Sequence, residues 1–289
     1  MHYLSFVSPN QDNSWGVEDS GIVYDLGPSG ANLADSLKEA IAQNIFGNVS
    51  KEQLAGAPGY PATEISYLPP IDAPEKILCI GVNYHDHRLE GSRPDIPAPT
   101  VFTRFTDSQM GHLQPAIRPY STEKYDYEGE MALVIGKPGY RISKANAFDH
   151  IAGYGAYNDF SVRDWQKAAS QWIPGKNFPS SGAFGPWLVP ANDIEDVTKL
   201  RLQTRVNGEV RQDAYVDQLI FDIPTIMEYV SGFTPLNVGD VIVTGTPGGV
   251  GLFYEPNGLL NDGDIVEVEI SQLGTLRNEV VQESMPAKV

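Results

Sequence analysis

The chain has 289 residues, 41% of them hydrophobic, which is enough to bury a sizeable core in one large domain or two. Its 37 acidic and 20 basic residues give a net charge of −17, without a cluster of Lys and Arg, and this balance disfavours nucleic acid and anionic membranes as partners. One cysteine excludes an intramolecular disulfide framework, and no apolar run approaches the roughly 18 residues of a membrane span. Because the N-terminus shows neither a basic nor an apolar leader, we expect a cytoplasmic protein.

A small N-terminal α/β domain is predicted for residues 1–70. Short strands are expected at residues 3–7, 14–17 and 21–26. A helix follows, because four aliphatic side chains recur at every fourth position and form one stripe: Leu33, Leu37, Ile41 and Ile45. Gly47 is expected to end this helix. The five prolines within residues 57–74 exclude a helix interior and predict an extended linker, so a second domain is placed at residues 71–289.

A strand predicted at residues 76–82 leads into a candidate catalytic pair. This strand contains Cys79, which is expected to be a buried thiol. His87 and Glu90 are three residues apart, so they share a face if their segment forms a helical turn. A carboxylate that holds one imidazole nitrogen leaves the other nitrogen free for acid–base chemistry. The same pattern fits a surface histidine with an acidic neighbour, and His85 competes for the role.

Three carboxylates are placed at the ends of predicted buried strands. Glu128 and Glu130 are two residues apart, so they point to the same face of a strand, directly before the apolar run 131–135. Asp159 follows a second apolar run at residues 151–157. Like charges at the edge of a core repel each other and are poorly solvated, so they need a cation. Oxygen ligands without Cys or a second His favour Mg²⁺ or Mn²⁺, although acidic pairs on solvated strand faces show the same spacing.

Further charged and polar residues accompany the carboxylates. Arg104 ends a predicted strand and is expected to face the core. Arg163 and Gln166 are three residues apart at a predicted helix start, so they share a face. The planar fork of Arg163 could clamp a substrate carboxylate, and a structural ion pair with Asp164 or Glu130 is an equal alternative.

The remaining elements are predicted to be short. They are a turn at 182–186, strands at 187–189, 202–206, 209–212, 240–244 and 265–270, a helix at 223–233 and a loose tail at 283–289. Asn207-Gly208 is a strong hairpin signal between two of these strands. The glycine-rich stretch 245–251 contains Pro247 and no following Lys-Ser or Lys-Thr, so it is expected to be a backbone turn beside a site and not a phosphate loop. The strand 265–270 is expected to close the chain.

Taken together and in this order, eight segments resemble the fumarylacetoacetate hydrolase superfamily: KILCIGVNYHDHRLEG, DYEGEMALVIGK, AGYGAYNDFSVRDWQ, GKNF, GPWLVP, VNGEVRQ, LIFDIP and GDVIVTGTPGGVG. They lie within roughly residues 75–280. The resemblance implies an α+β, β-rich fold, in which a mixed β-roll or β-sandwich catalytic domain follows the small N-terminal domain. It also implies a homodimer.

The resemblance further implies a role for each candidate residue. The ligands of Mg²⁺, with Mn²⁺ as the alternative, would be Glu128, Glu130 and Asp159. The catalytic residues would be the water-activating pair His87 and Glu90 and the oxyanion-stabilising Lys176. The substrate contacts would be Arg104, Arg163, Gln166 and Thr246. Arg104 stands where many members have Lys, and Pro179-Ser180-Ser181 where many have Asp-Thr-Phe, so the substrate is the least transferable inference.

These expectations favour a metal-dependent hydrolase, as in aromatic catabolism, that cleaves a carbon–carbon bond of a 1,3-diketo acid such as an acylpyruvate or fumarylpyruvate into pyruvate and a second acid. The same enolate chemistry serves decarboxylation of a β-keto acid such as oxaloacetate, our second expectation, and isomerisation or tautomerisation of a 2-hydroxymuconate-type keto acid, our third. A metal-stabilised binding domain without activity explains poorly why His87, Glu90 and Lys176 accompany the carboxylates. The sequence contains no G-x-S-x-G or H-E-x-x-H motif, which argues against a serine hydrolase or a zinc protease.

Overall fold

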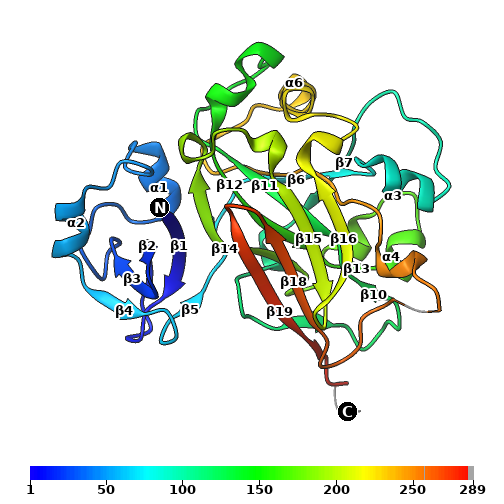
Figure 1. Cartoon of the computed structure of the whole chain (residues 1–289), viewed down its shortest axis with the longest axis horizontal. Helices are drawn as coiled ribbons and strands as arrows, with labels where there is room; N and C mark the ends of the chain where they lie inside the picture. Colours follow the sequence, from blue (N-terminus) through cyan, green and yellow to red (C-terminus); the bar gives the residue numbers. More distant parts are fainter. Residues whose placement is uncertain (257, 286–289) are drawn as a thin grey trace.

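Two large β-sheets form the framework of the chain (Figure 1). The computed structural model describes residues 1–256 and 258–285. In this part of the chain, a sheet of 12 strands has the order β4-β3-β2-β1-β14-β12-β11-β17-β6-β7, with β5 beside β1 and β8 beside β14. Its strands are β1 (His2–Val7), β2 (Asn13–Asp19), β3 (Ile22–Asp25), β4 (Gly59–Pro61), β5 (Ser66–Tyr67), β6 (Ile77–Gly81), β7 (Thr100–Arg104), β8 (Gln109–Met110), β11 (Gly129–Ile135), β12 (Ile151–Asp159), β14 (Gly182–Pro190) and β17 (Val241–Val243).

The second sheet has the order β16-β15-β18-β19-β9, and a separate pair consists of β10 and β13. These strands are β9 (Ala116–Arg118), β10 (Tyr125–Asp126), β13 (Ser161–Val162), β15 (Arg201–Val206), β16 (Glu209–Tyr215), β18 (Ile265–Ile270) and β19 (Gly274–Gln282). Most neighbouring strands are antiparallel, whereas β6 with β17, β8 with β14 and β9 with β19 are parallel. The predicted mixed, β-rich α+β fold is therefore confirmed.

Helices are short and lie outside the sheets. The α-helices are α1 (Leu37–Ala42), α2 (Lys51–Gly56), α3 (His85–Glu90), α4 (Arg163–Lys167), α5 (Ile173–Lys176) and α6 (Ile223–Phe233). The 3₁₀ helices are η1 (Thr106–Ser108), η2 (Lys144–His150), η3 (Ala191–Asp193), η4 (Val197–Lys199), η5 (Val216–Gln218) and η6 (Gly251–Phe253). None of the helices in residues 1–256 and 258–285 combines the length and the apolar character that a membrane crossing requires.

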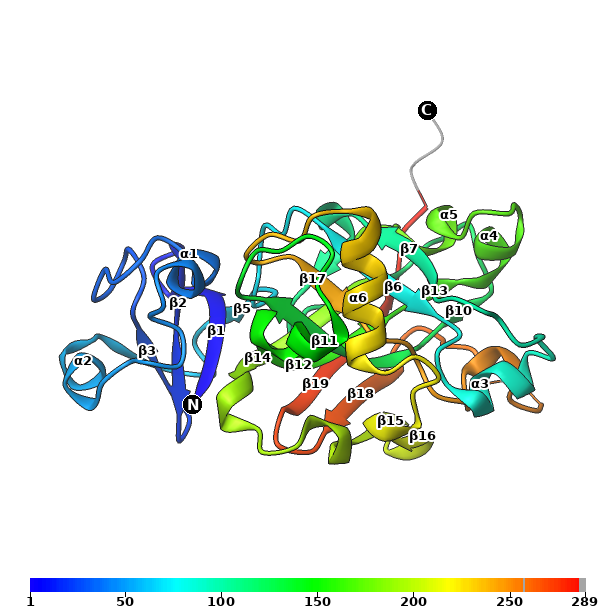
Figure 2. The ribbon, with the colours of Figure 1, turned by 90° about the horizontal axis from the view of Figure 1, so that it is seen from above.

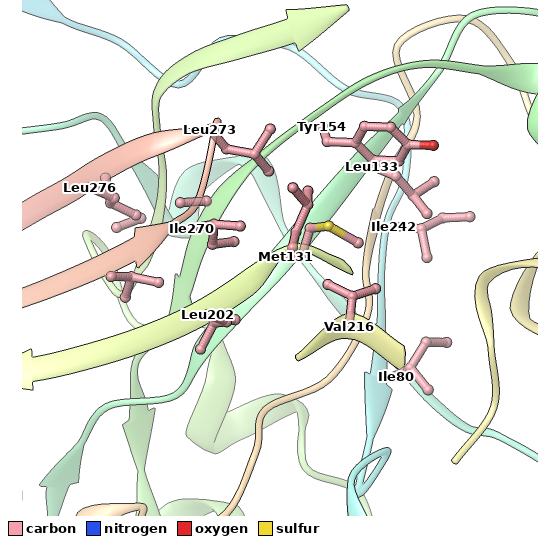
Figure 3. Packing of buried hydrophobic residues seen from close by; sticks show 14 of the residues in the cluster. Ile80, Met131, Leu133, Tyr154, Leu202, Val216, Ile242, Ile270, Leu273 and Leu276 are labelled. Carbon is pink, nitrogen blue, oxygen red and sulfur yellow. The ribbon is translucent and has the colours of Figure 1, made fainter. Parts of the chain in front are cut away.

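The central strand β11 is buried on both faces, as its continuous apolar sequence predicts. Met131 and Leu133 point toward the second sheet and pack with Leu202 and Ile270, as Figure 3 shows. The alternate residues, which include Val134, belong to a second buried cluster shared with the N-terminal strands. Both clusters fix the register of β11, because a slip of one residue would exchange its two faces.

The N-terminal region differs from its prediction in two respects. Its helix is shorter, because the Ser36 side chain caps the first turn and Asn44 adopts a left-handed φ of 59°, which ends the helix before Gly47. The expected linker at residues 57–74 contains the strands β4 and β5, which pair with β3 and β1, and α2 was not predicted at all. The strand β1 also pairs with β14, so one sheet continues across the predicted boundary between residues 70 and 71, which stays a prediction.

The C-terminal region confirms the hairpin, the helix and the strands expected at 240–244 and 265–270, and it corrects two other predictions. Asn207 and Gly208 both have positive φ, 51° and 81°, and connect β15 to β16. The residues expected to form a turn at 182–186 are the first half of β14. The strand β18 does not close the chain, because β19 follows it and buries Leu276, Asn278 and Val280 on one face. Because the buried face includes the polar Asn278, the sequence of this strand does not show a regular alternation of apolar and polar residues. The predicted tail at 283–289 lies partly outside the described residues.

The elements that carry the predicted catalytic residues lie together at one end of the molecule. In both views α3, α4 and the segment that contains η6 lie at the end opposite to β1, β2 and β3 (Figures 1 and 2). The first residues of β11 and the last residues of β6 and β12 lie toward this end, so they form the floor of any site there. Cys79 lies inside β6 as a buried free thiol, as predicted.

Candidate metal centre and active site

Three buried carboxylates meet where β11 begins and β12 ends. Each of the side chains of Glu128, Glu130 and Asp159 offers an oxygen, and these oxygens lie within 4.8 Å of one another. The register explains the meeting, because Gly129 is opposite Asn158 in the antiparallel pair and the backbone N–H of Asp159 donates to the carbonyl of Glu128 at 2.9 Å. The structure therefore brings together the three residues that the sequence proposes as metal ligands.

Two of the three carboxylates are neutralised by buried cations. The ammonium of Lys176 lies 2.7 Å from Glu128 Oε2 and 2.7 Å from Asp159 Oδ2, and Arg163 donates to Glu128 Oε1 at 2.5 Å. Burial by itself would raise the pKa of Glu128, but the charges of Lys176 and Arg163 outweigh it and hold that pKa below its ordinary value. Arg104 contacts Asp159 from the other side.

Glu130 is the carboxylate that remains uncompensated. Its Oε2 accepts a hydrogen bond from the backbone N–H of Gly245 at 2.6 Å, and it forms no ion pair with any described residue. Burial, together with the negative charges of Asp159 and Glu128, raises its pKa well above the ordinary value. A divalent cation would remove this penalty, since it compensates a carboxylate that the protein leaves without a partner.

The donor set fits a hard divalent metal. Around the site the buried acids are Asp126, Glu128, Glu130 and Asp159, and the buried Arg and Lys residues are Arg104, Arg163 and Lys176. With all of them ionised, four negative charges face three positive charges, and the excess falls on the candidate ligands. All candidate ligand atoms are carboxylate oxygens, which Mg²⁺ and Mn²⁺ prefer.

The histidine–carboxylate pair is assembled on α3. The Nδ1 atom of His87 lies 2.7 Å from Glu90 Oε1, and Glu90 Oε2 accepts from the backbone N–H of Gly249 at 2.8 Å. Gly249 has a φ of 98°, a conformation that favours glycine, so the glycine-rich stretch is the predicted turn beside a site. His87 lines the same pocket as Glu128, whereas His85 is exposed on a different pocket with Tyr84 and Asp86. Of the two histidines, His87 is therefore the one in the same pocket as the carboxylates.

The helix α4 and the turn after β17 complete the pocket. Arg163 Nη1 donates to Gln166 Oε1 at 3.1 Å, and both side chains are buried in the pocket lining. Thr246 Oγ1 donates to the carbonyl of Gly129 at 2.9 Å and also lines the pocket. Arg163 pairs with Asp126 and Glu128, so neither of its two predicted ion-pair partners, Asp164 and Glu130, is correct.

Arg104 ends β7 and faces the core, as predicted. Its side chain has no exposed surface and does not line the pocket, although a substrate contact was expected. It contacts Asp159 and donates to Ser181 Oγ at 2.6 Å. The structure therefore places Arg104 beneath the site as a partner of Asp159.

Sequence reasoning overlooked Asp126 and Gln212. Asp126 accepts hydrogen bonds from Arg163 Nε at 2.7 Å and from the backbone N–H groups of Gly251 and Leu252 at 2.8 and 2.9 Å. A signal was present, since Asp126 precedes Glu128 by two residues and continues the same alternation. Gln212 in β16 donates to Thr246 Oγ1, in the turn after β17, at 2.8 Å, and no local pattern predicts a contact between segments so far apart in the sequence.

Comparison with known proteins decides the family. A model described as fumarylacetoacetate hydrolase, C-terminal, matches residues 76–281. The chain belongs to the fumarylacetoacetate hydrolase family. This family member is 36% identical to the protein named oxaloacetate tautomerase fahd2, mitochondrial, of Xenopus laevis over 97% of this chain and 89% of that protein. It is 42% identical to oxaloacetate tautomerase YisK of Bacillus subtilis over 76% of this chain and 75% of that protein.

Solved structures agree with this assignment. This chain superimposes on maleylpyruvate hydrolase from Sphingobium with a TM-score of 0.82 and 25% identity. That structure is a complex with manganese (II) ion and pyruvate. The match covers 98% of this chain and 100% of that chain. Membership of an enzyme family is therefore shown for the chain, and its three buried carboxylates could hold a divalent metal such as the manganese named for that neighbour. The cytoplasmic location stays a prediction, since the Xenopus relative is named mitochondrial.

Proposed function

We propose that this protein is a divalent-metal-dependent tautomerase that interconverts the keto and enol forms of oxaloacetate or of a closely similar 2-oxo dicarboxylate. The observation that carries the proposal is that His87, a proton-transfer group held by Glu90, lines one pocket together with Glu128 and Glu130 of the carboxylate triad. The chain also aligns along 97% of its length with a named oxaloacetate tautomerase. This reaction was the third expectation from the sequence and now replaces hydrolysis as the first.

Mg²⁺ or Mn²⁺ bound to Glu128, Glu130 and Asp159 would supply Lewis acidity, which withdraws electron density from a 2-oxo group and stabilises enolate charge. Lys176 and Arg163 hold Glu128 ionised and in a fixed orientation as a ligand. The ammonium of Lys176 also lines the pocket, where it stabilises negative charge on the substrate oxygen.

His87 carries out the proton transfer. Its Nδ1 donates to the carboxylate of Glu90, so its Nε2 retains a lone pair that accepts the proton from C3 of the keto form. The electron pair of that carbon–hydrogen bond forms the C2–C3 double bond while the carbonyl electrons move to the 2-oxygen, and transfer of the proton from the His87 imidazolium to that oxygen gives the enol and restores the neutral imidazole. Glu90 stabilises the imidazolium that forms, while its second oxygen is held by the Gly249 N–H.

Hydrolysis of an acylpyruvate remains the second candidate, because the same pair can activate a water and because a maleylpyruvate hydrolase has this fold. The two reactions are separated by assaying Mg²⁺-loaded protein with oxaloacetate and with acylpyruvates. We expect rapid exchange of the C3 protons of oxaloacetate with deuterated solvent, followed by ¹H NMR, and little release of pyruvate from acylpyruvates. Fast acylpyruvate cleavage with no acceleration of C3 exchange would assign the hydrolase.

A homodimer, expected from the resemblance, is tested by light scattering.

A further inference from the structure

The cations inside the pocket are already neutralised. Lys176 and Arg163 each contact two carboxylates, and Arg104 contacts Asp159. Their charges therefore balance the floor of the site and contribute little net attraction for an incoming anion. In a chain with a net charge of −17, a metal at the triad would attract the 2-oxo acid end of a substrate, and a second carboxylate at the far end needs positive charge from another source.

Two cations at the mouth of the pocket lack an acidic partner. Arg93, in the loop after α3, and Lys167, at the end of α4, line the same pocket as His87 and Glu128. Both are exposed, and across residues 1–256 and 258–285 neither forms a salt bridge. Arg88 provides the contrast, since it belongs to the neighbouring turn and is paired with Asp95. Asp95, the acid in the same loop as Arg93, is thus paired with Arg88 and not with Arg93.

Each of the two cations is positioned by an aromatic ring. The guanidinium carbon of Arg93 lies 5.2 Å from the ring centroid of Trp172, and Lys167 Nζ lies 5.8 Å from that of Phe253. Trp172 is itself fixed, because its ring packs on Phe102 at 5.5 Å and against the backbone of Gly81. Contact with a ring face leaves the N–H groups free to donate, so both cations are held in place without being neutralised.

The charge of Arg93 also affects the pKa of Lys167. Partial burial lowers the pKa of Lys167, and the positive charges of Arg163 and Arg93 lower it further. Like charges at one pocket mouth are unfavourable in the free protein, and a bound anion between them removes the repulsion.

We propose that Arg93 and Lys167 form a subsite for the distal carboxylate of the substrate and thereby select dicarboxylic over monocarboxylic 2-oxo acids. The identity of the substrate class rests on the proposed function, in which the carboxylate triad and its metal receive the 2-oxo acid end. The far end of the molecule then lies toward the mouth. The planar fork of Arg93 matches a carboxylate, and Lys167 adds a second charged donor.

The test compares two acids that differ only at the far end. Oxaloacetate and 2-oxobutyrate share the 2-oxo acid group, and a methyl group in the second replaces the distal carboxylate. For Arg93→Met and Lys167→Met we expect KM for oxaloacetate to rise about 10-fold or more while kcat changes little, because a lost charge-assisted hydrogen bond weakens binding by that order. The kinetic constants for 2-oxobutyrate should stay unchanged. Arg93→Lys should recover part of the loss.

Lys124→Met is the matched control. Lys124 is exposed and close enough to affect the pKa of Lys167, but it does not line the pocket. The Lys124→Met substitution removes one positive charge from the same region. An equal rise in KM for oxaloacetate in this variant would show that the effect comes from the overall charge of the region, and it would overturn the subsite.

Calorimetry separates the subsite from the reaction assignment. Binding of both acids to Mg²⁺-loaded protein is measured in the parent chain and in the variants. Tighter binding of oxaloacetate that is lost only in Arg93→Met and Lys167→Met supports the subsite, even if the parent fails to tautomerise oxaloacetate and the proposed function falls. Equal binding of both acids by the parent, or equal loss of both in the variants, overturns the subsite while tautomerase activity can stand.

Discussion

Glu130 Oε2 lies 2.6 Å from the backbone nitrogen of Gly245, and this hydrogen bond and the charge of Lys176 only partly offset its burial and the negative charges of Asp159 and Glu128. A buried carboxylate in this position favours a bound cation. We expect EDTA to abolish activity and lower Tm by several degrees, and Mg²⁺ or Mn²⁺ to restore both, because a ligand that binds only the folded state stabilises it. Activity assays and thermal scans at known metal content check this.

Glu130→Gln should abolish metal binding in calorimetry. Glu123→Gln is the control, because the Glu123 side chain is 96% exposed and outside the site. Full activity in a preparation shown to contain no metal would contradict the metal centre.

The two histidines of α3 should differ in their contribution to catalysis. His87→Ala is expected to lower kcat by roughly 10² to 10⁴ with metal binding intact, because it removes the group that transfers the proton. His85→Ala should have little effect, since His85 is exposed on another pocket. Steady-state kinetics with metal analysis on each variant provides the measurement, and the opposite ranking would make His85 the base.

Glu90→Gln tests the orientation of the imidazole. The substitution keeps the size of the side chain and an acceptor for the Gly249 N–H, but it removes the charge that stabilises protonated His87. We expect kcat for C3 exchange to fall about 10-fold or more, as for other groups that orient a catalytic residue. Asp86→Asn, an exposed acid on the same helix, is the control. An unchanged rate in Glu90→Gln would exclude this role.

His112 predicts how stability depends on pH. Burial and, to a lesser extent, the charge of Arg277 lower its pKa from 6.5 to about 4, and its Nδ1 accepts from the Arg277 N–H at 3.0 Å. Because the folded-state pKa is below the unfolded one, stability is fully present above pH 6.5 and is lost as pH falls toward 4. The loss amounts to about 3 kcal/mol at most.

Urea denaturation of the parent chain at several pH values between 7.5 and 4 measures that loss. His112→Asn keeps an acceptor for Arg277 but cannot titrate, so the variant should be less stable at neutral pH, where it loses packing on Tyr67, and should show a smaller decrease on acidification. Parallel curves for the two proteins would remove His112 from the explanation.

Local patterns predicted the parts of the fold that depend on near neighbours. The buried strand β11, the Asn207-Gly208 turn and the spacing of His87 and Glu90 follow from periodicity and turn chemistry within a few residues. The roles of Lys176 and Thr246 came from the resemblance alone. What the sequence left open depends on pairing between distant segments, namely the Arg163 ion pairs, the burial of Arg104 beneath Asp159 and the strand β19.

The hydrogen bonds to Asp126 join two parts of the pocket that could otherwise change separately. Asp126 accepts a hydrogen bond from Arg163, which in turn contacts the candidate metal ligand Glu128. It also accepts hydrogen bonds from the backbone N–H groups of Gly251 and Leu252, in the segment that lines the pocket with Leu252 and Phe253. An engineer who wishes to change the accepted substrate can therefore redesign the side chains at 252–254 while the anchor keeps the loop in register. Asp126 itself should be kept, since its replacement would remove hydrogen bonds from Arg163, which holds Glu128, and from the backbone of Gly251 and Leu252 at the same time.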